Sequence, residues 1–223
     1  MIESHKASIN YLYIETEKAF KNFFKEKKDL SKFENIAKEI IKVNKNGFNL
    51  SLLSKEDKLS NHCLNVAIIS ERIGRHINLS EEDNYDLVLG ALIHDIGKFL
   101  IPINILNKPA KLSKEEKEVV MAHTKIGPPL LNNIRVNKRV IEIIKNHHDN
   151  IKIIKKPIKI YCSDLDLNVL LPVICSLADI TDAIISKRAY KKALPLTFAK
   201  KELRIKGFLD IEDLFNAIEL KDI

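Results

Sequence analysis

Apolar residues recur every three or four positions along most of the chain, which is the spacing of amphipathic helices. This spacing predicts helices over residues 8–24, 30–43, 60–77, 84–96, 113–126, 137–147 and 173–186, and a last one from 210 to about 218. Ser113 and Glu116 have the spacing of a capping box, and Asp210 has the side chain of an N-cap. The polar run from Asn44 to Gly47 predicts a stop after the second helix. The expected fold class is therefore all-α.

One stretch departs from the helical pattern. Residues 151–171, IKIIKKPIKIYCSDLDLNVLL, have partial alternation and a proline, so we expect a short irregular or hairpin insert near 151–168. The 223 residues include only 6 glycines and 7 prolines, which favours a helix-rich fold. A chain of this length can bury one sizeable core, with at most a helical extension beside it.

Composition narrows the class of protein. The N-terminus lacks the apolar core of a secretory signal, and the apolar stretch 169–178 is interrupted by Pro172 and Ser176, so we expect a cytoplasmic protein with no membrane span. Three cysteines without CxxC spacing argue against a disulfide framework or a thiolate zinc site. The net charge is +7, but the lysines are mostly mixed with acids, which does not favour a nucleic-acid polymer as partner.

The polar residues that end or interrupt apolar helical faces are mostly histidines and aspartates. A satisfied core histidine is the commoner role for any one of them, but chance would scatter such residues over exposed faces. The set comprises His62, His94, Asp95, His123, His147, His148 and Asp179. We therefore expect these side chains to meet in a buried metal centre.

The ligand types restrict the metal. Imidazole with carboxylate suits Fe, Mn, Ni, Co or Zn, whereas Ca or Mg would call for oxygen ligands alone. Seven candidate ligands exceed what one catalytic ion needs, so two ions bridged by a carboxylate explain the number better. Asp95 is the expected bridge.

The ordered series resembles the HD superfamily of metal-dependent phosphohydrolases. It comprises His62, HDIGK at 94–98, HTKIG at 123–127, the pair at 147–148 and ADITDA at 178–183. The stretch HDIGKFLIPINILNKPAKLSKEEKEVVMAHTKIG is similar to the HD-GYP branch, and ISKRAYKKALP is a further signature of that branch. The resemblance implies a helical HD-domain bundle, with an N-terminal helical segment (1–50) packed on a phosphodiesterase domain (51–223). It also implies hydrolysis of cyclic di-GMP, a bacterial second messenger, to linear pGpG, with a second cut to GMP.

The resemblance also assigns roles to single residues. It implies metal ligation by all seven histidines and aspartates of the set, and two divalent transition-metal ions, with Fe or Mn ahead of Ni, Co or Zn. Asp95 and Lys98 are the catalytic candidates, since Lys98 matches the lysine that faces the scissile phosphate. Arg188 and Lys191 match cations that bind the distal phosphate, and with Lys156 and Lys159 they predict an electropositive cleft for a cyclic dinucleotide.

The departures from the branch concern the substrate. The Gly-Tyr-Pro loop is absent from HHDNIKIIKKPIKIYCSD, although Asp149 keeps the acid that follows the paired histidines. Tyr161 has two readings, as a stacking partner for a base and as a packing tyrosine. Asp182 also has two interpretations, as a residue that orients metal ligands and as a helix-surface aspartate. Lys58 stands where some relatives carry a glutamate for a third ion, which favours two ions.

Two alternative functions stay open at this point. One is an HD phosphohydrolase that acts on another nucleotide, and the other is a non-catalytic module that binds cyclic di-GMP. The helices before Ser51 carry no evident chemistry, and they are interpreted either as scaffold or as the surface of a homodimer.

Overall fold

The structure is a computed structural model that describes residues 2–25, 28–45, 53, 54, 56, 58–148, 166–186, 198 and 201. Every regular element among these residues is a helix, which confirms the all-α prediction. Most of the predicted insert near 151–168 lies outside the described residues, as does the helix predicted after Asp210.

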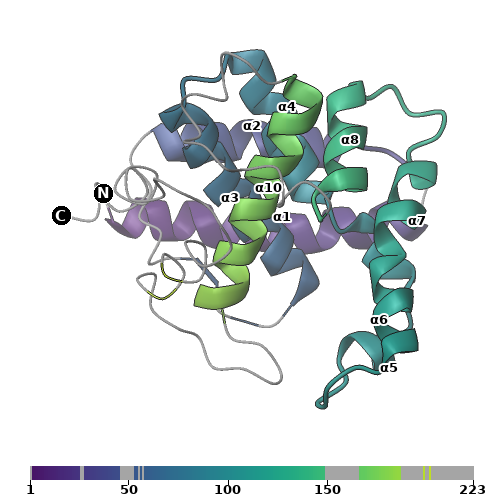
Figure 1. Cartoon of the computed structure of the whole chain (residues 1–223). Helices are drawn as coiled ribbons and strands as arrows, with labels where there is room; N and C mark the ends of the chain where they lie inside the picture. The colour runs from purple at the N-terminus through teal and green to yellow at the C-terminus, as the bar shows by residue number, and fades with distance from the viewer. Residues whose placement is uncertain are drawn as a thin grey trace.

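Helix α3 (Leu59–His76) is the centre of the bundle. All of its residues from Ser60 to Gly74 are buried, which is the pattern of a helix surrounded by others rather than of a surface helix. It packs against α4 (Glu81–Ile93) and α10 (Leu167–Ile185), and α8 (Lys138–Asn146) packs on both of these helices (Figure 1). The ends of these four helices surround the candidate site.

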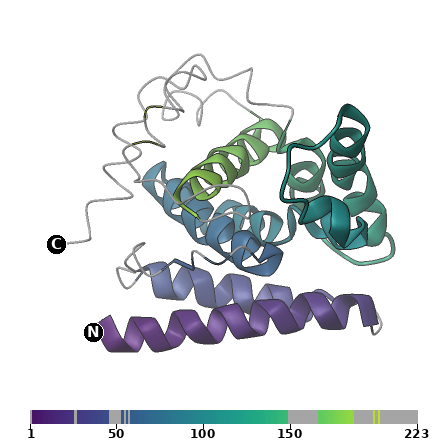
Figure 2. The same cartoon turned by 90° about the horizontal axis from the view of Figure 1, so that it is seen from below.

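The first two helices form a layer beside this bundle. Helix α1 (Ile2–Lys25) and α2 (Ser31–Lys45) lie side by side and contact α3 (Figure 2). The ring of Phe20 packs against Phe33 at a centroid distance of 4.8 Å and stacks on Phe99 at 4.3 Å. This aromatic cluster joins the N-terminal helices to the segment that follows the His94–Asp95 pair.

A helical arm connects α4 to α8. It consists of the 3-10 helix η2 (Ile96–Leu100), α5 (Ile103–Leu106), α6 (Lys114–Met121) and α7 (His123–Leu130), and α5 and α6 project from the body in Figure 1. The predicted capping box is confirmed, because Ser113 accepts from the Glu116 amide and Glu116 accepts from the Ser113 amide. The helix predicted over 113–126 divides at Ala122, which is a turn residue between α6 and α7.

Helix α10 begins earlier than the sequence pattern indicates. Its predicted start at 173 is wrong, and so is the end of the predicted insert at 168, because Asp166 caps a helix that begins at Leu167. Pro172 costs the helix one amide donor. That loss is tolerated because the surrounding residues, including Leu170, Leu171 and Val173, are buried in the core. By length and composition α10 is apolar enough to span a membrane, but 67% of its apolar window is buried against the other helices, as in a core helix.

We expect Phe20→Ala to lower the free energy of unfolding by about 3–5 kcal/mol, because it opens a cavity between α1, α2 and η2. Chemical denaturation followed by circular dichroism measures this loss. Tyr11→Ala is the control on the same helix, since Tyr11 is 58% exposed and its truncation should change the free energy by less than about 0.5 kcal/mol. Equal losses in the two variants would contradict the packing described.

Candidate metal centre

Most of the candidate ligands stand at helix ends. His94 and Asp95 follow the last residue of α4, His123 follows the end of α6, and His147 and His148 follow α8. His62 lies in the first turn of α3, and Asp179 lies within α10. The structure brings all seven predicted ligands into one region among α3, α4, α7, α8 and α10.

Three of the histidines are fixed by the same local interaction. The Nδ1 atom of His94 lies 2.7 Å from the Ala91 carbonyl, and that of His123 lies 2.6 Å from the Val120 carbonyl. The Nδ1 atom of His147 faces two carbonyls of the last turn of α8, both at 3.1 Å. These carbonyls belong to the final turns of their helices, where the ladder of backbone hydrogen bonds ends. Each histidine therefore donates its Nδ1 proton to a carbonyl in the last turn of the preceding helix.

This interaction decides which ring nitrogen is free. An imidazole whose Nδ1 donates to a carbonyl keeps a lone pair on Nε2 when it is neutral. Burial lowers the pKa of His147 well below its ordinary value, and burial also lowers the pKa of His148 to about 4. Neutral imidazoles are the form that binds metal ions.

The free nitrogens converge on the Asp95 carboxylate. The Nε2 atoms of His62 and His94 lie 3.6 and 3.4 Å from Asp95 Oδ2. On the other side, the Nε2 atoms of His123 and His147 lie 3.1 and 3.8 Å from Oδ1. Asp95 is fully buried. Burial acts to raise its pKa, but His94, Lys98 and His123 outweigh burial and hold the pKa well below the usual range, so Asp95 is ionised.

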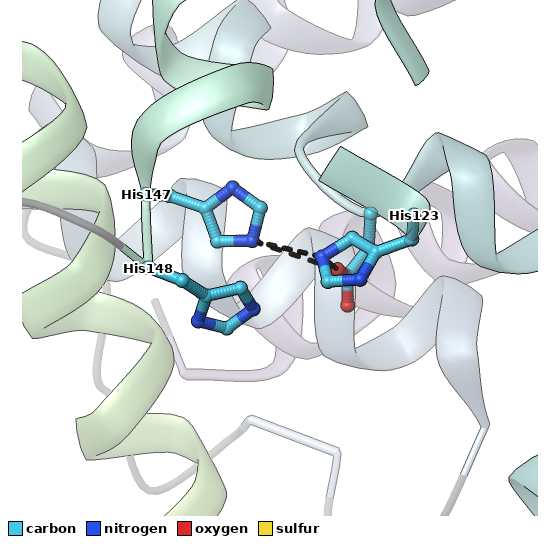
Figure 3. A group of neighbouring side chains, drawn as sticks. His123, His147 and His148 are labelled. Atoms are coloured by element: carbon cyan, nitrogen blue, oxygen red, sulfur yellow. Dashed lines mark hydrogen bonds and ion pairs between the residues drawn. The ribbon is translucent and has the colours of Figure 1, made fainter. Parts of the chain in front are cut away.

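This arrangement of acceptors fits a cation. The Nε2 atoms of His123 and His147 face each other at 3.2 Å (Figure 3), although each ring already commits its Nδ1 proton to a carbonyl. His94 Nε2 and Asp95 Oδ1 are buried and have no hydrogen-bond partner among the residues that the structure describes. Lone pairs directed at one another and at a carboxylate repel, whereas a metal ion among them would accept all of them.

The ligands fall into two groups. One consists of Asp95, His123, His147 and His148, and the other of His62, His94 and Asp179; within each group the ligand atoms lie within 4.8 Å of one another. Figure 3 labels the three histidines of the first group, in which His148 comes from the end of α8 beside His147. The Asp95 carboxylate belongs to the first group through Oδ1 and faces two histidines of the second through Oδ2.

Asp182 and Asn65 support the second group. Asp182 is fully buried, which rules out the helix-surface reading of this residue. Its Oδ2 accepts from His62 Nδ1 at 2.6 Å, and its Oδ1 accepts from Asn65 Nδ2 at 2.7 Å. Sequence reasoning missed Asn65, whose signal was an amide side chain three positions after His62, one helical turn along the same face. The carboxylate fixes the His62 ring so that Nε2 points at Asp179 Oδ1, 3.2 Å away.

Lys98 reaches the same carboxylate from η2. Its Nζ lies 2.6 Å from Asp95 Oδ2, and its side chain is 19% exposed. Burial acts to lower the pKa of Lys98, but the Asp95 and Asp179 carboxylates outweigh it and raise the pKa above its usual value. Lys98 is therefore a fixed positive charge beside the ligand groups.

A close approach explains the glycine between the His94–Asp95 pair and Lys98. A Cβ atom at Gly97 would lie 2.3 Å from the carbonyl oxygen of His123, which is backbone and cannot swing away. The absence of a side chain therefore lets η2 and α7 approach closely enough for Asp95 and His123 to meet.

The remaining sequence predictions lie outside the described residues. They concern Asp149, Tyr161, Arg188 and Lys191, together with Lys156 and Lys159 of the expected cleft. Lys58 is described, and it is exposed and paired with Glu56 at 3.1 Å.

The model of the HD domain family matches residues 59–184, which is more than half of the chain and contains every candidate ligand. A cyclic di-GMP phosphodiesterase of Thermotoga maritima is 31% identical over 84% of this chain and 48% of its own length. A cyclic di-GMP phosphodiesterase of Pseudomonas aeruginosa is 32% identical over 59% of this chain and 31% of its own. A 3'3'-cGAMP-specific phosphodiesterase of Vibrio cholerae is 29% identical over 64% of this chain and 30% of its own. The chain thus spans less than half the length of these curated relatives.

Replacing the carboxylate behind His62 should weaken the centre without removing a ligand. We expect Asp182→Asn to lower the affinity for Mn²⁺ roughly 10- to 100-fold, because the His62 ring loses the charge that orients it. Competition with a chelating indicator measures this affinity. Glu81→Gln is the control, since Glu81 is 90% exposed. An Asp182→Asn protein that binds Mn²⁺ as tightly as the wild type would contradict the role given to this carboxylate.

Proposed function

Because the chain belongs to the HD domain family, we propose that it is a metal-dependent phosphodiesterase that opens cyclic di-GMP to linear pGpG. The observation that carries this proposal is the convergence of four imidazole Nε2 atoms on the buried, ionised Asp95. Hydrogen-bond acceptors that face one another repel, so stability of the core does not explain why these Nε2 atoms face the Asp95 carboxylate. The relatives named as cyclic dinucleotide phosphodiesterases supply the substrate class.

The proposed cofactor is a pair of divalent transition-metal ions, with Fe or Mn preferred for a mixture of imidazole and carboxylate ligands. His123, His147 and His148 would hold one ion, His62, His94 and Asp179 the other, and Asp95 both. Such a pair supplies an activated water for attack on phosphorus and neutralises charge on the phosphate oxygens.

The protein's own residues do the positioning. The last-turn carbonyls and Asp182 hold the imidazoles in one tautomer, so no ring has to turn or exchange a proton during a catalytic cycle. Lys98 places a positive charge 2.6 Å from the bridging carboxylate, where negative charge on the phosphate develops in the transition state. Burial of Asp95, His94, His123 and His147 keeps bulk water from screening these interactions.

A second candidate substrate has its own support. Several of the relatives are named as specific for 3'3'-cGAMP, a cyclic dinucleotide with one adenine in place of a guanine. The metal centre acts on the phosphodiester, which both substrates share, so it does not distinguish them. Hydrolysis of another nucleotide and binding without cleavage are outcomes that the same assays identify.

We expect the wild type loaded with Mn²⁺ or Fe²⁺ to convert cyclic di-GMP to pGpG, as followed by chromatography of the nucleotides. Chelation should abolish turnover and added Mn²⁺ should restore it. Asp95→Asn should reduce turnover roughly 100-fold or more, since it removes the ligand that both groups share. Turnover of 3'3'-cGAMP alone would transfer the proposal to that substrate. Metal-loaded wild type that binds cyclic di-GMP without cleaving it would refute the enzymatic proposal.

Lys98→Met separates the lysine's effect on catalysis from metal binding. Methionine keeps the length of the apolar stem but removes the charge, so we expect kcat to fall about 10²- to 10³-fold. Mn²⁺ affinity should stay the same or rise, because the ammonium group that contacts Asp95 no longer competes with the ion. A variant that loses metal and activity together would show that Lys98 serves only to hold the centre.

A further inference from the structure

A series of hydrogen-bonded side chains joins the N-terminal layer to the metal centre. Tyr13 of α1 packs against the core, and its hydroxyl donates to Oδ1 of Asn65 in α3. The Asn65 amide donates to Asp182 Oδ1 at 2.7 Å. The other oxygen of Asp182 accepts from His62 Nδ1 at 2.6 Å. These four side chains are called the Tyr13–His62 network below.

The direction of each hydrogen bond in this network follows from its neighbours. The backbone amide of Ser54 donates to the Tyr13 oxygen at 2.6 Å, which leaves the hydroxyl proton for Asn65 Oδ1. Burial raises the pKa of Tyr13 well above its ordinary value, so the phenol keeps this proton. With Oδ1 facing Tyr13, Asn65 presents Nδ2 to Asp182 and to the Ser54 carbonyl, 2.9 Å away. The tyrosine hydroxyl therefore fixes which end of the amide faces the Asp182 carboxylate.

The inner part of the network is shielded from solvent. Asn65 and Asp182 are almost completely buried, so bulk water does not replace a donor that is lost there. Ser186 also donates to Asp182 Oδ1, at 2.7 Å, but it comes from the end of the same helix, α10. Asn65 instead ties the carboxylate to α3, the helix that carries His62. If the Asn65 amide turned over, its oxygen would face the carboxylate and this tie would be lost.

We infer that Tyr13 is a positioning residue for the metal centre. Through the Asn65 amide it holds the Asp182 carboxylate, and this carboxylate holds the His62 ring with Nε2 directed at Asp179. The inference rests on the proposed function, because it concerns the same centre. The position of α1 against α3 then affects a ligand of the centre, and this is a role that neither scaffold nor dimer surface describes.

The test measures Mn²⁺ affinity without any substrate, by competition with a chelating indicator. Tyr13→Phe keeps the ring and removes the hydroxyl, so we expect the affinity to fall about three- to tenfold, the effect of one lost hydrogen bond. Tyr11→Phe is the matched control, because it removes a hydroxyl from the same helix at a position that is 58% exposed. Phe20→Ala is the control for stability, because it loosens the packing of α1 without removing a member of the network. Both controls should keep the wild-type affinity.

A double-mutant cycle separates positioning from a general effect on the fold. When Asp182→Asn is already present, Tyr13→Phe should change the Mn²⁺ affinity by less than about twofold, because the carboxylate that the network holds is gone. Asn65→Leu removes the middle of the network, so it should weaken Mn²⁺ binding at least as much as Tyr13→Phe does. Circular dichroism verifies that each variant is folded at the temperature of the measurement.

The outcomes separate this inference from the function on which it rests. Wild-type Mn²⁺ affinity in Tyr13→Phe would overturn the inference, and so would equal losses from Tyr13→Phe with and without Asp182→Asn. A loss of the same size in Phe20→Ala would also overturn it, because the effect would then belong to the packing of α1. A protein that shows the expected Mn²⁺ affinities but leaves cyclic dinucleotides intact would overturn the proposed function and support the positioning role.

Discussion

The buried Asp95 carboxylate, surrounded by imidazole acceptors, is the constraint on which the site depends. Four Nε2 atoms lie between 3.1 and 3.8 Å from its oxygens, and Asp95 itself is fully buried. An ionised carboxylate in such a place is costly unless positive charge compensates it. Lys98 supplies one such charge, at 2.6 Å from Oδ2, but within the described part of the chain Oδ1 meets only imidazole nitrogens and no hydrogen-bond donor. Cations between the ligands would supply the remaining positive charge.

The same interactions end the helices and prepare the ligands. His94, His123 and His147 each donate Nδ1–H to a carbonyl in the last turn of the helix before them. That bond fixes the ring and leaves Nε2 on the far side, directed away from the helix. The ends of α4, α6 and α8 thus deliver preoriented ligands without dedicated loops. This explains why the ligands follow apolar helical faces, and why His94, His123 and His147 are wholly buried.

The sequence predicted which histidines and aspartates lie together, but not what surrounds them. Histidines at the ends of apolar faces can be recognised from the sequence, because helical periodicity alone predicts that they point inward. The role of Asn65 was not visible, since it depends on α10 bringing Asp182 to within 2.7 Å of the amide. The start of α10 was missed because a proline normally ends a helical pattern, whereas here the buried face outweighs one lost hydrogen bond. A cavity of about 1010 Å³ is lined by lysines of α1, η2 and α6 and of the segments before α3 and after α5, and no local pattern indicates that these elements share a wall.

The charges of the proposed centre explain how an anionic substrate could enter so deep a site. Two divalent ions would bring four positive charges to a region where Asp95, Asp179 and Asp182 supply three negative ones. Lys98 adds a positive charge at the boundary with the cavity, so the loaded centre keeps a net positive potential. Imidazoles bind metal ions in their neutral form, so the ligand histidines would compensate none of it. A phosphodiester, which carries one negative charge, is therefore attracted to the centre, whereas a further metal ion would be repelled.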